Sequence, residues 1–235
     1  MIREAIILAG GLGTRLRTVV SDVPKSMADV NGRPFLEYVF DYLIRYNIGK
    51  VVVSTGYKGD MISGCFGKKY RSLDLSYAEE KEPLGTGGGI RNAFRLINGE
   101  EAFVMNGDSL FSINLEEMDR FHHSGHGLLT LALRYLEDTG RYGAVRLGIS
   151  HRIKGFTEKK ENGGPGYING GVYILNKNFI TGDFFEDKFS IEKDCFEKYY
   201  MDHTMLGFVA DGYFLDIGIP EDYERAQHEF QRLEY

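Results

Sequence analysis

The fold is set by the segment EAIILAGGLGTRL, residues 4–16. Its first part, residues 4–9, is a short continuous apolar run, which is typical of a strand buried on both faces of a sheet. The glycines that follow lack a Cβ, so successive backbone N–H groups can converge on an anion. Arg15 adds a planar set of donors that suits phosphate oxygens. We therefore predict a buried first strand that ends in a phosphate-binding loop.

This loop matches neither of the two common nucleotide-binding loops. It lacks the Gly-Lys-Ser/Thr of a Walker loop, and Leu16 stands where the GxGxxG pattern needs its third glycine. No acidic residue closes the next predicted strand, residues 50–54, to hold a ribose hydroxyl as in dinucleotide-binding folds. A plain glycine turn between a strand and a helix is the alternative interpretation.

The rest of the chain falls into two patterns. Strands at 4–9, 50–54, 73–78 and 102–105 alternate with helices that start at Pro34 and at 86–97 and 115–123, which predicts parallel βαβ units. Strands at 128–133, 143–147, 153–156 and 171–175 follow without long helices between them, and a helix at 220–233 closes the chain. We predict one α/β domain, residues 1–235, with a doubly wound first lobe and a more antiparallel second lobe.

The composition limits the partners. The net charge is −6 and no block of Lys and Arg stands out, which argues against nucleic acid or an anionic membrane surface. Cys65 and Cys195 form no CxxC, so we expect reduced thiols in a cytoplasmic protein rather than a disulfide scaffold or a structural zinc site. The apolar run at the N-terminus is too short for a signal sequence or a membrane span.

Three charged residues follow strands or turns in a way that suits phosphate chemistry. Asp108 and Asp216 each come after an apolar strand, where an open α/β sheet presents its ligand edge, and carboxylates are ligands that Mg²⁺ prefers. Lys25 follows Pro24 and could be a second cation beside the phosphates. The alternatives are a turn residue for Asp108, a cap for Asp216 and a solvated loop lysine for Lys25.

Several further motifs carry a family resemblance. GGLGTRL followed by Pro24-Lys25 resembles the opening of the sugar nucleotidyltransferases. In the family's order there follow EPLGTGG (82–88), NGD (106–108), FTEK (156–159), YINGGVY (167–173) and LDIGIPEDY (215–223). Ordered matches over nearly the whole chain are more specific than any one glycine motif. RYG (141–143) and FSIEKD (189–194) make the chain most similar to the members that act on D-glycero-α-D-manno-heptose 1-phosphate. Ser26 and Lys160 depart from the pattern, since many relatives have proline there.

The resemblance implies a fold and an activity. The fold is a three-layer, Rossmann-like (GT-A-like) α/β structure with a mixed, mostly parallel central sheet and a smaller antiparallel lobe. Residues 1–115 would bind the nucleotide, residues 125–215 the sugar, and a C-terminal helix would span 220–234. The activity is transfer of a nucleoside monophosphate, here GMP from GTP, to a sugar 1-phosphate with release of pyrophosphate. The cofactor would be Mg²⁺ and the enzyme a monomer or homodimer.

The resemblance also assigns roles to individual residues. The residues that would act in catalysis are Arg15 and Lys25, and those that would bind the metal are Asp108 and Asp216. The residues that would contact the nucleotide are Leu8, Ala9, Gly10, Gly11, Gly13, Thr14, Glu80, Gly85 and Thr86. The residues that would contact the sugar phosphate are Gly143, Glu158, Lys159, Asn169 and Gly170.

Glu80 bears on the choice of base. Guanine presents two adjacent donors, which a carboxylate can accept together, whereas uracil and thymine present one donor between two acceptors. Glu80 therefore favours GTP. The alternative is that Glu79, Glu80 and Glu82 form a solvated acidic turn.

Other functions remain as alternatives. Mannose 1-phosphate or another hexose 1-phosphate could replace the heptose, since no physical feature of the sequence separates them. A glycosyltransferase would be expected to carry Asp-x-Asp at the strand end, and Asn106-Gly107-Asp108 lacks it. A non-catalytic nucleotide-sugar-binding protein would be expected to lose Arg15, Lys25 or an aspartate.

The histidines at 122, 123 and 126 are interpreted as a solvated helix end rather than a metal site.

Overall fold

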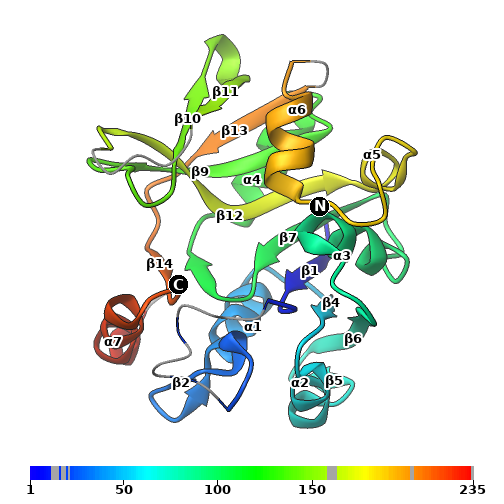
Figure 1. The fold of residues 1–235 in the computed structure, drawn as a ribbon, viewed down its shortest axis with the longest axis vertical. Helices are drawn as coiled ribbons and strands as arrows, with labels where there is room; N and C mark the ends of the chain where they lie inside the picture. Colours follow the sequence, from blue (N-terminus) through cyan, green and yellow to red (C-terminus); the bar gives the residue numbers. More distant parts are fainter. Residues whose placement is uncertain (12–15, 17–19, 21, 158–162, 202–203, 234–235) are drawn as a thin grey trace.

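A ten-stranded sheet forms the centre of the molecule (Figure 1). The computed structural model describes residues 1–11, 16, 20, 22–157, 163–201 and 204–233. The strands are β1 (Glu4–Leu8), β4 (Lys50–Thr55), β5 (Lys69–Tyr70), β6 (Leu73–Glu79), β7 (Glu101–Asn106), β9 (Leu129–Leu136), β10 (Ala144–Leu147), β11 (Ile153–Thr157), β12 (Gly166–Asn176) and β13 (Met205–Val209). Their order is β11-β10-β12-β7-β1-β4-β6-β5, with β9 on β12 and β13 on β9.

The parallel half of the sheet is buried on both faces. β1 lies between β4 and β7 and is parallel to both. Ala5 and Ile7 pack into the hydrophobic cluster on one face, and Ile6 packs into the cluster on the other. All three are fully buried, which explains why this strand has a continuous apolar sequence.

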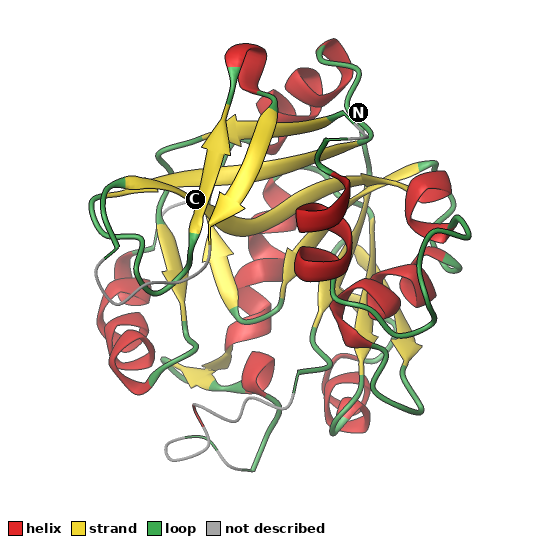
Figure 2. Cartoon of the chain, turned by 45° about the horizontal axis from the view of Figure 1, so that its top comes forward, coloured by secondary structure: helices red, strands yellow, loops and turns green. Residues whose placement is uncertain are grey.

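Helices cover both faces of the sheet (Figure 2). They are α1 (Phe35–Arg45), α2 (Gly59–Phe66), α3 (Gly85–Phe94), α4 (Leu115–Ser124), α5 (Lys177–Thr181), α6 (Glu197–Tyr199) and α7 (Pro220–Glu229). Short 3-10 helices span Lys25–Met27, Ile149–His151 and Phe230–Arg232, and a π-helix spans Ile191–Phe196. The apolar side chains of α1 and α2 belong to one cluster, and those of α3 and α5 to the other. Among the described residues, no helix is both long and apolar enough to cross a membrane.

The second half of the chain adds antiparallel pairing. β12 runs antiparallel to β7, β9 and β10, and its register with β9 shifts between Asn169 and Tyr173. Gly171 lies in this shift with a φ of +74°, a conformation that glycine adopts without strain. The predicted α/β fold with a mixed sheet is confirmed. The sequence did not predict α2 and β13, and α7 ends at Glu229 rather than in the 230s.

Two small sheets bring distant segments to the edge of the large one. β2 (Asp29–Val30) pairs with β3 (Arg33–Pro34), and β8 (Ser109–Phe111) pairs with β14 (Phe214–Asp216). In the second pair Asp216 lies opposite Ser109, so the two predicted metal ligands are brought to neighbouring positions.

The histidines at the end of α4 require a correction. His122 is not solvated, since its side chain is 1% exposed. Its Nδ1 lies 2.8 Å from Thr130 Oγ1 and its Nε2 lies 3.2 Å from Glu101 Oε1. His122 follows Met118 by one helical turn and shares its buried face, which the sequence interpretation overlooked. Burial lowers the pKa of His122.

Tyr42 holds the segment after β8 against α1. Its hydroxyl donates to Ile113 O at 2.7 Å and accepts from Ile113 N at 3.2 Å, and the side chain is fully buried. The substitution Tyr42→Phe removes both hydrogen bonds and leaves the Ile113 amide only its bond to Phe111 O, so we expect the free energy of unfolding to fall by about 1–3 kcal/mol. Urea denaturation measures this change. Tyr46→Phe, at the residue that caps the end of α1 and is partly exposed, is the matched control, and an equal loss in both variants would contradict the assignment.

Candidate active site

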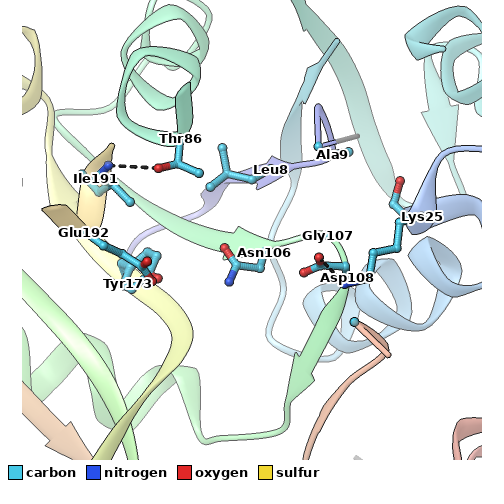
Figure 3. Close-up of a pocket in the computed structure, with 13 residues that line it drawn as sticks. Leu8, Ala9, Lys25, Thr86, Asn106, Gly107, Asp108, Tyr173, Ile191 and Glu192 are labelled. Atoms are coloured by element: carbon cyan, nitrogen blue, oxygen red, sulfur yellow. Dashed lines mark hydrogen bonds and ion pairs between the residues drawn. The ribbon is translucent and has the colours of Figure 1, made fainter. Parts of the chain in front are cut away.

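A pocket of about 320 Å³ opens where β1 and β7 end (Figure 3). It is lined by Leu8, Ala9, Gly11, Lys25, Ser26, Thr86, Asn106, Gly107, Asp108, Tyr173, Ile191, Glu192 and Gly218. The carboxyl ends of parallel strands are where open α/β sheets bind ligands. The position therefore agrees with the predicted phosphate loop after β1.

Lys25 joins the two predicted metal ligands. Its Nζ lies 2.6 Å from Asp108 Oδ2 and 3.3 Å from Asp216 Oδ1, and its side chain is 10% exposed. The two carboxylates therefore converge on one cationic point. Ile217 N also donates to Asp108 O at 3.0 Å, which ties the two aspartate-bearing segments together through the backbone.

The pair of carboxylates fits a divalent metal ion. Burial and the charge of Asp108 raise the pKa of Asp216, and Lys25 opposes this rise. The described residues hold no group of three or more metal-ligating side chains. Two carboxylates with the remaining positions left to phosphate oxygens and water are the usual donor set for Mg²⁺. The cluster of two carboxylates and one ammonium carries a net negative charge, which favours a further cation.

The glycine loop packs closely against the turn that follows β4. A Cβ on Gly10 would lie 3.3 Å from Gly56 N, and one on Gly56 would lie 3.1 Å from Gly10 O. Leu8, Ala9 and Gly11 line the pocket directly. Three predicted residues of the loop, Gly13, Thr14 and Arg15, lie outside the described residues.

Hydrogen bonds join the start of α3 to the second half of the chain. Thr86 Oγ1 accepts from Ile191 N at 2.9 Å, and Gly87 N donates to Phe189 O at 2.9 Å. Gly85 has a φ of +74°, and a Cβ there would lie 2.5 Å from Phe189 O. Only glycine permits this approach, so the predicted nucleotide turn and the predicted sugar lobe form a continuous pocket wall.

Glu80 holds the same turn in place. Its Oε1 accepts from Ser54 Oγ and its Oε2 accepts from Leu84 N, each at 3.0 Å. The side chain is half-buried, so it does not belong to a solvated acidic turn. A carboxylate has about four acceptor positions, but Glu80 is not among the described residues that line the pocket. Base recognition by Glu80 stays a prediction.

Asn169 is oriented by its neighbours on the sugar side. Its Nδ2 donates to Tyr173 Oη at 3.0 Å and to Glu192 Oε1 at 3.2 Å, and its Oδ1 accepts from Gly171 N at 3.0 Å. Burial raises the pKa of Tyr173 well above its usual range. Glu158 and Lys159 lie outside the described residues.

Two glycines predicted to contact the sugar have structural neighbours that explain them. Gly143 has a φ of +77°, and its amide already donates to Thr139 O at 3.0 Å. A Cβ on Gly170 would lie 2.3 Å from Phe111 Cδ1. Glycine thus provides the positive φ of the RYG turn at position 143 and lets β12 approach the Phe111 ring at position 170. Their contacts with a sugar stay predictions.

The pocket includes residues to which the sequence analysis gave no role. Asn106 and Gly107 lie within NGD, Tyr173 within NGGVY, Ile191 and Glu192 within FSIEKD, and Gly218 within LDIGIPEDY. The sequence therefore identified the motifs, but it did not indicate which side chains within each motif face the pocket. Ser26, which the sequence analysis named only as a departure from the family pattern, lines the pocket beside Lys25.

The comparison with known proteins decides the family. The profile of the nucleotidyl transferase family matches residues 4–232. The chain belongs to this family. It is 47% identical to D-glycero-alpha-D-manno-heptose 1-phosphate guanylyltransferase of Aneurinibacillus thermoaerophilus over 97% of this chain and 98% of that protein. It is 38% identical to the Campylobacter jejuni protein of the same name over 94% and 96%. The structure also matches the crystal structure of HddC from Yersinia pseudotuberculosis complexed with GMP-PN, with a TM-score of 0.87. The two sequences are 36% identical, and the match covers 97% of this chain and 100% of that chain.

The hydrogen bond between Thr86 and Ile191 can be tested directly. Thr86→Val keeps the shape but removes the acceptor, so the buried Ile191 amide is left unpaired and the pocket wall loosens. We expect kcat/KM for the nucleotide to fall by roughly tenfold, which corresponds to about 1.4 kcal/mol. Thr86→Ser keeps the hydroxyl and is the control. Equal activity in the two variants would show that the hydroxyl has no part in holding the wall.

Proposed function

We propose that this protein transfers GMP from GTP to D-glycero-α-D-manno-heptose 1-phosphate, forming a GDP-heptose and releasing pyrophosphate. The observation that supports it most is the convergence of Asp108, Asp216 and Lys25 beside the loop after β1. The nature of the two substrates rests on the relatives, whose names specify this sugar phosphate and guanylyl transfer.

The reaction needs no protein base. The nucleophile is an oxygen of the sugar 1-phosphate, whose second pKa is about 6, so the group is largely dianionic at neutral pH. The protein has to bring two anions together and to neutralise the pyrophosphate that leaves. Positioning and electrostatic stabilisation are the main contributions to catalysis of this kind.

The chain's own residues divide these tasks. Lys25 neutralises charge beside the triphosphate, and Arg15 adds bidentate hydrogen bonds to phosphate oxygens. Asp108 and Asp216 would hold Mg²⁺, which neutralises phosphate charge when it is bound. Lys159 would contact the sugar phosphate, and Glu158, Asn169, Gly143 and Gly170 would bind sugar hydroxyls.

The two lobes then have distinct ligands. We assign GTP to the lobe formed by residues 1–115 and the sugar phosphate to the lobe formed by residues 125–215. Glu80 would recognise the two adjacent donors of guanine through acceptor positions that the Ser54 and Leu84 hydrogen bonds leave open. Cys65 and Cys195 are free thiols, which supports the predicted cytoplasmic location.

Pyrophosphate release tests the assignment. The assay pairs GTP, ATP, CTP, UTP or dTTP with heptose 1-phosphate, mannose 1-phosphate or glucose 1-phosphate, with Mg²⁺ present. We expect the highest kcat/KM with GTP and the heptose phosphate. Preference for UTP or dTTP would refute the role of Glu80, and preference for mannose 1-phosphate would make this a mannose-1-phosphate guanylyltransferase. A folded protein that releases no pyrophosphate from any pair would be a binding protein instead.

Removal of one carboxylate tests the metal site. Asp216→Asn keeps the shape but removes a charge, so we expect kcat to fall at least about a hundredfold, because bound metal ions contribute several kcal/mol to such reactions. The Mg²⁺ concentration that gives half-maximal activity should also rise. Asp74→Asn makes the same change at an exposed position and should behave as wild type. An unchanged Mg²⁺ dependence in Asp216→Asn would remove this residue from the metal site.

A further inference from the structure

A second cavity adjoins the active site on the other side of Asp216. Its volume is about 300 Å³, and Asp216 forms part of its wall. The rest of the wall comes from the end of β9, the turn before β10, β14 and α7, and Figure 1 shows β14 next to α7. Because Asp216 also contacts Lys25, the two cavities meet at the predicted metal ligands.

An aromatic row connects this cavity with the predicted sugar site. Gly170, on β12, lies against the Phe111 ring. The Phe111 and Phe214 rings are 5.7 Å apart, and the Phe214 and Tyr142 rings are 5.8 Å apart, both in edge-to-face contact. Tyr142 precedes Gly143 in the chain and lines the cavity together with Phe214. The row thus joins the predicted sugar contacts Gly143 and Gly170 to the wall of the cavity.

Arginine side chains supply donors to the cavity. Arg134, Arg141 and Arg225 all line it. The hydrogen bond from Arg141 Nη2 to Asp222 Oδ2, at 2.8 Å, engages one end of its guanidinium. Arg134 Nη1 is buried and has no hydrogen-bond partner within the part of the chain that the structure describes. Its ion-pair partner, Asp211 Oδ1, lies 3.9 Å away, which is beyond hydrogen-bond distance, so the Arg134 guanidinium keeps donor capacity for a ligand hydroxyl.

The charges favour a neutral ligand. Asp222 is nearly buried, and its two oxygens accept from Arg141 and Arg225. Arg225 also pairs with Glu229 at 3.3 Å, and Arg134 lies 3.9 Å from Asp211. The carboxylate of Asp216 adds a further negative charge to the wall. The positive charges are thus offset, so the cavity offers hydrogen bonds and aromatic faces rather than a site for a second phosphate.

From this arrangement we infer that the cavity receives the C6–C7 end of the seven-carbon sugar, with Arg134 as a residue that determines specificity. The inference rests on the proposed function and adds the part of the site that would separate a heptose from a hexose. Beyond C5, mannose 1-phosphate carries a single CH₂OH group, whereas the heptose carries a secondary and a primary hydroxyl. The additional hydroxyl supplies an acceptor for an N–H donor of the Arg134 guanidinium. A site built to bond a hydroxyl discriminates strongly against a substrate that lacks it.

The test compares two sugar phosphates in matched variants. With saturating GTP and Mg²⁺, kcat/KM is measured for D-glycero-α-D-manno-heptose 1-phosphate and for mannose 1-phosphate. In Arg134→Met the ratio of the two values should fall by about tenfold, as expected for the loss of one hydrogen bond from a charged group. Leu136→Trp, which narrows the cavity, should lower the ratio as well. Arg95→Met, which changes an exposed arginine at the C-terminal cap of α3, should leave the ratio unchanged.

The outcomes separate this inference from the proposed function. The inference is overturned if the ratio of the two kcat/KM values in Arg134→Met and Leu136→Trp stays within about twofold of wild type, or if both sugars lose kcat/KM equally. Turnover by the wild-type protein would then still support the proposed function. Wild-type protein that turned over neither sugar phosphate would overturn the function and the inference together. If Arg134→Met does not fold, Arg134→Lys and Leu136→Trp decide, since the first keeps the charge but not the planar set of donors.

Discussion

The contact of one lysine with two aspartates constrains the rest of the structure. Lys25, Asp108 and Asp216 come from segments far apart in the chain, and each must be held within reach of the same point. Opposite unit charges about 4 Å apart attract by roughly 4 kcal/mol near a protein surface, which helps to offset the repulsion between the two carboxylates. The backbone fixes the geometry: β14 pairs with β8, and Ile217 bonds to Asp108.

Other elements also help to hold the residues of the site in position. α7 packs beside the β2–β3 hairpin, where Gln227 Nε2 donates to Asp29 O at 2.7 Å and Gln227 Oε1 accepts from Asn31 N at 3.0 Å. This hairpin follows the helical turn of Lys25, so the C-terminal helix steadies the loop that delivers the lysine. On the other side, the Thr86–Ile191 hydrogen bond closes the pocket wall. The site is therefore pre-formed from both halves of the chain, as a reaction that joins two anions requires.

The sequence predicted those features whose signal is local. β1 and β7 have continuous apolar runs because they are buried on both faces, and the glycines after β1 mark a turn that packs closely against Gly56. Asp108 and Asp216 could be paired because the ends of strands meet at one edge. α2 was missed because GDMISGCF contains two glycines and a weak apolar pattern. The burial of His122 and the engagement of Glu80 depend on Glu101, Thr130 and Ser54, and the sequence alone does not place these beside them. The second cavity is invisible in the sequence for the same reason, since Arg134, Phe214 and Arg225 meet only in the folded chain.

The central claim is that the protein positions the two phosphates for direct attack and forms no covalent bond to the nucleotide itself. The stereochemistry at the α-phosphorus tests it most directly. The reaction is run with one diastereomer of guanosine 5′-O-(1-thiotriphosphate), and the configuration of the nucleotide-sugar product is read by ³¹P NMR. A single in-line displacement inverts the configuration. We expect inversion, and retention would show two successive displacements through a guanylylated residue, which would contradict the account.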